Sequence, residues 1–243
     1  MVAEDPGLPA DAAGLGIGAD RIRPLPWTET GLSDGVGEPE DTPIPLHVLC
    51  QPVDIVARSL LGARIVSTVG GVTCAGVIVE TEAYGGQEDS ASHAATRSGI
   101  TKRNRAMYGA PGRAYVYRSY GVHWCLNVVT GREGSPAAVL LRGLDPISGH
   151  DVMSKRRRGR LPLVAGPGRL AQALGVDDRL YGHVLDEVPL QLLQGWKVPD
   201  RDVVVTGRIG ISTAAELPLR FYVDGSAGVS VKSARHPASE LPA

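Results

Sequence analysis

The chain of 243 residues lacks the cysteine pattern of a disulfide framework or a zinc site and the long apolar run of a membrane span. Its three cysteines, Cys50, Cys74 and Cys125, are an odd number without a CxxC pair, which indicates neither a disulfide framework nor a zinc site. No stretch approaches the roughly 20 apolar residues of a membrane helix, and the start, MVAEDPG, lacks the features of a secretory signal. We therefore expect a cytoplasmic protein with no membrane partner.

Motifs of several common enzyme classes are also missing. There is no GxGxxG after a strand, no P-loop, no HExxH and no GxSxG in the chain. Nucleotide hydrolysis, zinc proteolysis and serine hydrolysis therefore lack their usual signals. We expect no metal, no nucleotide and no redox cofactor.

Acidic residues are absent from the whole segment between Ser90 and Arg132, which carries seven lysines and arginines. The formal net charge of -1 hides this asymmetry. Residues 1–45 carry nine acids and two arginines, a net charge of -7, so residues 46–243 carry +6. A second basic block, KRRRGR, covers residues 155–160. Clustered positive charge is typical of phosphate binding, although a solvated surface is the simpler explanation for any single run.

Composition divides the chain into three parts. The first 45 residues contain seven glycines and seven prolines, are acidic and show no apolar period, which is typical of a disordered tail. Residues 46–235 should form one globular domain, and residues 236–243 a flexible C-terminus. We find no internal repeat and no second core.

The domain alternates between strand and helix patterns without regularity. Aromatic and β-branched runs around glycines predict two hairpins, over 63–80 and 110–131, and proline and glycine at opposite ends predict helices. The helices are expected at 52–62, 101–109 and 165–175, and further strands at 136–144, 188–193, 202–211 and 219–231. This pattern favours a single mixed α+β domain with a mainly antiparallel sheet.

Unusual polar and aromatic residues concentrate between residues 80 and 142. ETEAYGG follows the apolar strand VTCAGVIV, and a strand that ends in acids can simply be leaving the core. Tyr115 and Tyr117 share one face of a predicted strand, whereas Tyr120 lies in the turn, where it has no sheet to pack against. In a basic setting such a tyrosine could enter a base stack, or it could fold back onto its own hairpin.

Several long motifs, in one order, resemble the alkyladenine (3-methyladenine) DNA glycosylases, which are monofunctional alkylpurine repair enzymes. They are VETEAY, SASHAAT, RNRAMYGAPGRAYVYRSYGVHWCLNV, AVLLRGLDP, AGPGRLAQALG and PLRFYVDGSAGVSV, and together they cover about residues 46–232. The resemblance implies a curved antiparallel sheet, flanking helices and a protruding hairpin that enters the minor groove of double-stranded DNA containing a damaged purine. It implies base excision repair of 3-methyladenine, 7-methylguanine, hypoxanthine or ethenoadenine.

The resemblance also implies roles for particular residues. Glu82 would be the general base that activates water, helped by Arg142 and the backbone carbonyl of Ile209. The purine pocket would consist of Tyr84, His93, Tyr117 and Asn127, of which Asn127 excludes guanine, and Tyr120 would intercalate. The basic positions expected to contact DNA phosphates are Arg97, Arg103, Arg105 and Arg118.

One carboxylate is enough for hydrolysis, because it can accept the proton of water and offset the positive charge that develops on the sugar. No lysine occurs between residues 80 and 101 to serve as an amine nucleophile, so we expect a monofunctional enzyme that leaves an abasic site. We also expect the enzyme to be a monomer. It would lie on the bacterial nucleoid, or in the nucleus if eukaryotic. A catalytically silent damaged-DNA binding protein, and an enzyme for RNA or free nucleosides, are the alternatives.

Overall fold

The computed structural model describes residue 39 and residues 41–85, 89–92 and 99–232. The strands of this part are β1 (Arg64–Ser67), β2 (Cys74–Tyr84), β3 (Ala114–Ser119), β4 (His123–Val129), β5 (Ala138–Ser148), β6 (Leu190–Leu193), β7 (Val203–Thr206) and β8 (Arg220–Val223). The helices are α1 (Leu46–Leu49), α2 (Val53–Ser59), α4 (His150–Arg156) and α5 (Pro167–Leu174). Short 3₁₀ turns are η1 (Val69–Gly71), η2 (Arg105–Tyr108), η3 (Asp178–Leu180) and η4 (Asp200–Asp202).

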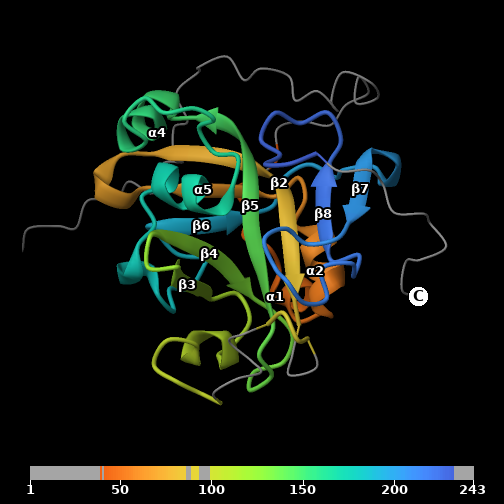
Figure 1. Ribbon diagram of the computed structural model, residues 1–243. Helices are drawn as coiled ribbons and strands as arrows, with labels where there is room; N and C mark the ends of the chain where they lie inside the picture. The colour runs from red at the N-terminus through yellow and green to blue at the C-terminus, as the bar shows by residue number, and fades with distance from the viewer. Residues whose placement is uncertain (1–38, 40, 86–88, 93–98, 233–243) are drawn as a thin grey trace, which may run out of the picture.

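All eight strands belong to one antiparallel sheet, which confirms the predicted α+β domain (Figure 1). The main path runs β3, β4, β5, β2, β1 and β6. β2 pairs with β5 along one edge, while its other edge pairs first with β1 and then with β8. β2 changes partner from β1 to β8 half-way along its length, so the sheet divides into two branches at the second half of β2. The bulges between β2 and β5 also bend the sheet.

Helices cover the sheet where its apolar residues are continuous. α5 packs on β4 and β5, and α2 lies beside β2, where the hydroxyl of Thr81 donates to the carbonyl of Ala57. The core side chains Leu60, Ile78, Leu141 and Leu170 are completely buried. No helix among the described residues is long and apolar enough to cross a membrane.

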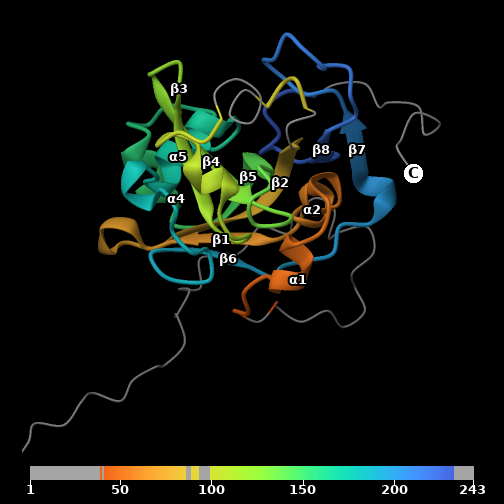
Figure 2. The ribbon, with the colours of Figure 1, turned by 90° about the horizontal axis from the view of Figure 1, so that it is seen from below.

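A hairpin of β3 and β4 projects from the body of the protein, and the connection between β7 and β8 projects from the same side (Figure 2). The end of β2 lies between these two projections (Figure 2). At the hairpin tip, Tyr120 and Gly121 both have positive φ, 49° and 68°. The predicted position of Tyr120 in the turn is therefore confirmed.

The domain limits can be compared with the contacts of the first described residues. Pro43 bridges to Leu193 of β6, and the backbone N–H of Ile44 donates to the carbonyl of Leu192. Contacts with the sheet thus begin a few residues before the expected boundary at residue 46. Most of the predicted N-terminal tail, and the end of the chain from residue 233, lie outside the described residues.

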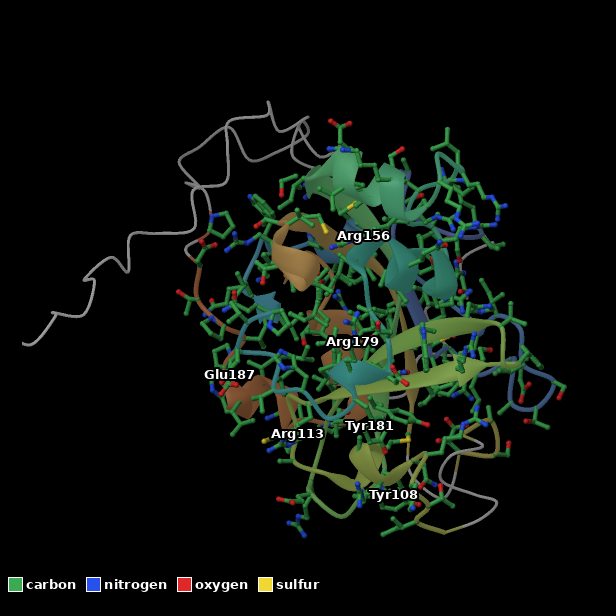
Figure 3. The ribbon with its side chains drawn as sticks, turned by 90° about the vertical axis from the view of Figure 1, so that its left-hand side faces the viewer. Tyr108, Arg113, Arg156, Arg179, Tyr181 and Glu187 are labelled. Carbon is green, nitrogen blue, oxygen red and sulfur yellow. The ribbon has the colours of Figure 1, made fainter. Side chains whose placement is uncertain are left out.

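The sequence patterns missed the short helices α1 and α4. Residues 150–156 form α4, whose last two residues begin the basic run 155–160. Because α4 has only seven residues and ends in a lysine and an arginine, its apolar period is too short to stand out. A helix here explains why Met153 is buried and why Arg156 points inward, where it donates to the carbonyls of Ala173 in α5 and Val69 in η1 (Figure 3).

Candidate active site

Glu82 lies near the end of β2 with a fully buried side chain. Three donors hold its carboxylate. The hydroxyl of Tyr84 and Nη1 of Arg142 donate to Oε2 over 2.9 and 3.1 Å, and the backbone N–H of Ile209 donates to Oε1 over 2.7 Å. A strand merely leaving the core would expose this acid, so that simpler interpretation of ETEAYGG is wrong. A carboxylate has about four acceptor positions, and these donors leave one for a further ligand.

Arg142 reaches Glu82 from a β-bulge in β5. In the register, Glu80 of β2 is opposite Gly143, and Thr81 is opposite Leu141, so Arg142 has no partner of its own. Such bulges re-aim a side chain, which here reaches both acids on one face of β2. Arg142 therefore pairs with Glu82 through Nη1, and its Nε also donates to Glu80 Oε1 over 3.1 Å.

A pocket of about 840 Å³ opens in front of this pair. The three residues that hold Glu82 line it, so the carboxylate lies directly behind the pocket wall. The lining among the described residues is Tyr84, Ala91, Ser92, Thr101, Arg103, Asn104, Met107, Tyr115, Tyr117, Ser119, Tyr120, His123, Cys125, Asn127, Ala138, Leu140, Arg142, Pro167, Ile209, Gly210 and Ile211. Its volume is ample for a planar heterocycle with part of its sugar.

Tyrosines dominate the inner wall of the pocket. Tyr115 and Tyr117, predicted to share a face of β3, have ring centroids 5.4 Å apart. The neighbouring β4 contributes Asn127, which is buried and whose Nδ2 donates to the carbonyl of Tyr115 over 2.9 Å. The fold brings seven of the residues predicted for the site to one pocket, which are Tyr84, Arg103, Tyr117, Tyr120, Asn127, Arg142 and Ile209. His93, predicted to join them, lies outside the described residues.

Burial keeps the pocket phenols neutral. It raises the pKa of Tyr115 to about 12, and it raises the pKa of Tyr117 well above its usual range. Burial, followed by the negative charge of Glu82, raises the pKa of Tyr84. Tyr84 can therefore serve only as a hydrogen-bond donor to Glu82 at neutral pH.

These shifts predict a loss of stability in alkali. The unfolded chain releases its tyrosine protons near pH 10, whereas the three folded phenols keep theirs, so the free energy of unfolding should fall as pH rises above about 10. Each phenol contributes a slope of about 1.4 kcal/mol per pH unit. Urea unfolding at several pH values should show this decline, and Tyr115→Phe should reduce its slope by about 1.4 kcal/mol per pH unit. An unchanged slope in that variant would contradict the assignment.

The hairpin tip exposes apolar side chains beside the pocket. Tyr120 is 90% exposed and Val122 is 72% exposed. The alternative in which Tyr120 folds back onto its own hairpin is therefore wrong. Its positive φ also costs about 1 to 3 kcal/mol for a residue with a side chain. Neither the exposure of this side chain nor the strain of its backbone favours folding of the free protein.

Comparison with known protein families shows the family to which a chain with this pocket and hairpin belongs. The family model described as methylpurine-DNA glycosylase matches residues 47–227, a range that includes Glu82, Arg142 and the whole hairpin. The chain belongs to the methylpurine-DNA glycosylase family. It is therefore an N-glycosylase, a hydrolase of N-glycosyl bonds, and its place is in DNA repair.

Individual relatives agree with the family assignment. A protein of Methanoculleus marisnigri, provisionally named 3-methyladenine DNA glycosylase, is 49% identical over 180 residues, 72% of this chain and 92% of the relative. Proteins with the same provisional name from Carboxydothermus hydrogenoformans and Granulibacter bethesdensis are 44% and 45% identical, covering 78% and 85% of this chain and 99% and 90% of theirs.

Basic residues of this glycosylase lie on the hairpin and beside it. Arg103, Arg105 and Arg118 are all exposed. Nη2 of Arg103 donates to the carbonyl of Arg118, and the two guanidinium groups lie 5.9 Å from the ring of Tyr117 and 5.3 Å from that of Trp124, respectively. Arg97, the fourth predicted phosphate contact, lies outside the described residues.

Two positioning contacts were missed by sequence reasoning. Arg208 is buried, lies 4.8 Å from the centre of the Tyr84 ring, and forms a two-pronged ion pair with Asp89. This ion pair positions the ring of Tyr84 through Arg208 and the backbone N–H of Gly85 through Asp89. The only sequence signal was the arginine in GRIGI, directly before Ile209. The described residues contain no group of three or more histidine, cysteine or acidic side chains that could hold a metal ion.

Proposed function

We propose that the enzyme takes an alkylated or deaminated purine nucleotide out of duplex DNA into its pocket and hydrolyses the N-glycosidic bond, leaving an abasic site. The observation that carries this proposal is the buried carboxylate of Glu82, held by Tyr84, Arg142 and Ile209 directly behind the wall of an aromatic pocket. Extraction of the base is required because an active site cannot reach C1′ inside a stacked duplex.

The chemical step needs one base and one water. The oxygen of water forms a bond to C1′ of the sugar, the bond from C1′ to the purine nitrogen breaks, and its electron pair leaves with the purine. The proton of the water passes to Glu82, whose negative charge also offsets the positive charge that develops on the sugar. Arg142 and the backbone of Ile209, on the pocket side of Glu82, would orient the water.

The aromatic wall supports the choice of a purine. Stacking of a base on an aromatic ring contributes about 1 to 3 kcal/mol, comparable with the few kcal/mol that extraction costs. Tyr84 and Tyr117 would stack on the base, and Asn127, whose amide is held by Tyr115, would exclude guanine by contact with its 2-amino group. The relatives named for 3-methyladenine support alkylated purines as the substrate class.

The projecting hairpin supports binding through the minor groove. Tyr120 would fill the space that the extracted base leaves in the duplex, while Arg103, Arg105 and Arg118 contact phosphates on either side. A single subunit holds the pocket, Glu82 and the hairpin together, so a monomer is sufficient for the reaction. The enzyme would be associated with chromosomal DNA, in the cytoplasm of a bacterium or the nucleus of a eukaryote.

The absence of a lysine among the described pocket residues supports hydrolysis by water alone. An enzyme that also cuts the strand uses an amine to form a covalent intermediate with the sugar. Borohydride should therefore trap no covalent complex between the enzyme and DNA that carries a damaged base. A trapped complex would show that the reaction proceeds through an amine instead.

The reaction is tested by single-turnover release of base. Wild-type enzyme should release hypoxanthine or 3-methyladenine from a duplex that contains one such base, and should release less from a single strand of the same sequence. Equal release from a free nucleoside or from RNA would favour the alternative substrates. Binding of the duplex without any release would identify a damaged-DNA binding protein.

The basic run at residues 155–160, which begins at the end of α4, contains both buried and exposed side chains. Arg156 donates to the carbonyls of Val69 and Ala173, and Arg157 donates to Gln172, so both are engaged inside the protein. Lys155, Arg158 and Arg160 are exposed. These three side chains are the part of the run available to DNA phosphates.

This division predicts two different phenotypes. Joint substitution of Arg158 and Arg160 by alanine should reduce the slope of log affinity against log salt by about one for each phosphate that the variant no longer neutralises, with little change in stability. Arg156→Ala is the matched control, because it should lower the melting temperature and leave the salt slope unchanged. If the double variant keeps the wild-type slope, the run does not bind DNA.

A further inference from the structure

A second carboxylate lies beside Glu82 and has no place in the chemical step. Glu80 is completely buried, so it is not a surface residue. Its Oε1 accepts from Nε of Arg142 over 3.1 Å, from Nε of Arg220 over 2.8 Å and from the hydroxyl of Ser230 over 2.8 Å. Its Oε2 accepts from the backbone N–H of Ser230 over 2.6 Å.

Two glycines allow the chain to approach Glu80 in this way. A Cβ atom on Gly143 would lie 2.2 Å from the carbonyl oxygen of Gly228, and one on Gly228 would lie 1.9 Å from that of Leu144. Any side chain at either position would push the segment that carries Ser230 away from β5. The close approach of the two backbones therefore brings Ser230 onto Glu80.

Arg220 completes the group from the opposite strand. It lies on β8 and is completely buried. Its Nη1 donates to Thr206 over 3.0 Å, its Nη2 donates to the carbonyl of Val231, and its guanidinium lies 4.6 Å from the ring of Tyr222. Every arm of this arginine is engaged, and it does not line the pocket.

The four charged groups together are neutral. Glu80 and Glu82 lie two residues apart on one face of β2, where two buried carboxylates repel each other and one tends to be protonated. Arg142 alone could balance one of them. Arg220 supplies the second positive charge, so the two buried acids face two buried cations.

We propose that Glu80 and Arg220 are positioning residues that hold Arg142 in a one-point contact with Glu82 and keep Glu82 ionised for the reaction. The inference rests on the proposed roles of Glu82 and Arg142. An arginine next to a single carboxylate tends to bind both oxygens in parallel, which would leave Glu82 little capacity to accept a proton. Here Glu80 occupies Nε and Ser230 Oγ accepts from Nη2, so only Nη1 reaches Glu82.

The contacts of Arg142 also leave donors for the pocket. A guanidinium has five N–H groups, and three of them are used by Glu80, Glu82 and Ser230. The remaining two belong to a side chain that lines the pocket, where they can bind the water or the sugar. Release of Glu80 from Arg142 would let the guanidinium rotate and disrupt this arrangement.

A pH profile can detect this arrangement because few other groups near it titrate in acid. The groups that face the two carboxylates are Tyr84, Tyr117, Cys125, Arg142 and Arg220. Burial raises the pKa of Tyr84, of Tyr117 and of Cys125, the last to about 11, so none of them changes charge between about pH 4 and 8. Tyr222 faces Arg220, and His123 lines the outer pocket, and both are the same in every variant compared.

The test is single-turnover release of hypoxanthine from a duplex between about pH 4 and 9, by wild type, Glu80→Gln, Arg220→Gln and Arg220→Lys. Loss of the Arg220 charge should move the acid limb of the profile to higher pH by about one unit, because the two acids then share one cation. Loss of the Glu80 charge should move it to lower pH, because Glu82 then has two cations, and should lower the plateau rate about 10-fold. Arg220→Lys keeps the charge and should keep the limb in its wild-type position.

Opposite displacements from two members of one network cannot arise from loss of stability alone. If both glutamine variants lose the same factor of activity at every pH, with an unmoved acid limb, Glu80 and Arg220 are structural only and the inference is wrong. Should Arg220→Gln fail to fold, the direction of the Glu80→Gln displacement decides. If wild type releases no base at any pH, the proposed function itself is wrong, which is a different result.

Discussion

Glu82→Gln should reduce single-turnover release of base by about 10²- to 10⁴-fold, the range expected when a general base is lost. The amide is close in size to the carboxylate, so the pocket keeps its shape. It cannot accept a proton from water and carries no charge to offset the positive sugar. Because the residues predicted to contact DNA, Tyr120, Arg103 and Arg118, are untouched, the affinity for duplex DNA should change little.

Two controls make the Glu82 result specific. Glutamine presents an NH₂ group to Arg142 or to the N–H of Ile209, so a modest fall in melting temperature is expected, and DNA affinity shows whether the fold survives. Glu82→Asp keeps the charge but withdraws it from C1′, and should retain more activity than the amide at every pH. If Glu82→Gln releases base at the wild-type rate, the carboxylate is structural and another group must activate water.

Tyr120→Gly should weaken base release from a damaged duplex by about 10- to 100-fold, the equivalent of one stacking interaction. In the proposed complex this ring occupies the place of the extracted base, so without it the base returns to the stack. The free protein should not lose stability. Relief of the strain at φ 49° contributes about 1 to 3 kcal/mol, which offsets the 0.5 to 1 kcal/mol or so that glycine costs through its greater freedom when unfolded.

The measurement must show that Tyr120→Gly lowers base release while it leaves the stability of the free protein unchanged or higher. A thermal melt and single-turnover release should be recorded for wild type, Tyr120→Gly and Tyr120→Phe. Phenylalanine keeps the ring, and should keep most of the activity and all of the strain. If Tyr120→Gly is as active as wild type on a damaged duplex, the tip does not enter the base stack. If it is both inactive and less stable, the tyrosine supports the hairpin instead.

The local elements of the site could be read from the sequence. Alternation of aromatic and β-branched residues predicted β3 and β4, and the glycine after Tyr120 placed this tyrosine in the turn. Pro167 and Gly175 predicted α5 to within two residues at its start and at its end. In each case the signal lies within about ten residues, because turn and helix-end preferences are properties of the local backbone.

Contacts between distant residues could not be predicted. Arg220 is 140 residues from Glu80, and Asp89 is 119 residues from Arg208, so no spacing rule relates the partners. Ile209 was assigned through its carbonyl, whereas the contact seen with Glu82 is made by its N–H. The bulge that directs Arg142 depends on the register between β2 and β5, which the sequence of neither strand determines alone.

The sequence alone determined that two acids lie on one face of a strand, that a tyrosine lies at the tip of a basic hairpin and that the chain resembles the alkylpurine glycosylases. Because side chains on a strand alternate with a period of two, Glu80 and Glu82 were equivalent at that level. Only the tertiary structure separated them. Arg220 of β8, together with Ser230, contacts Glu80. Glu82 instead contacts Tyr84, Arg142 and Ile209, which line the pocket.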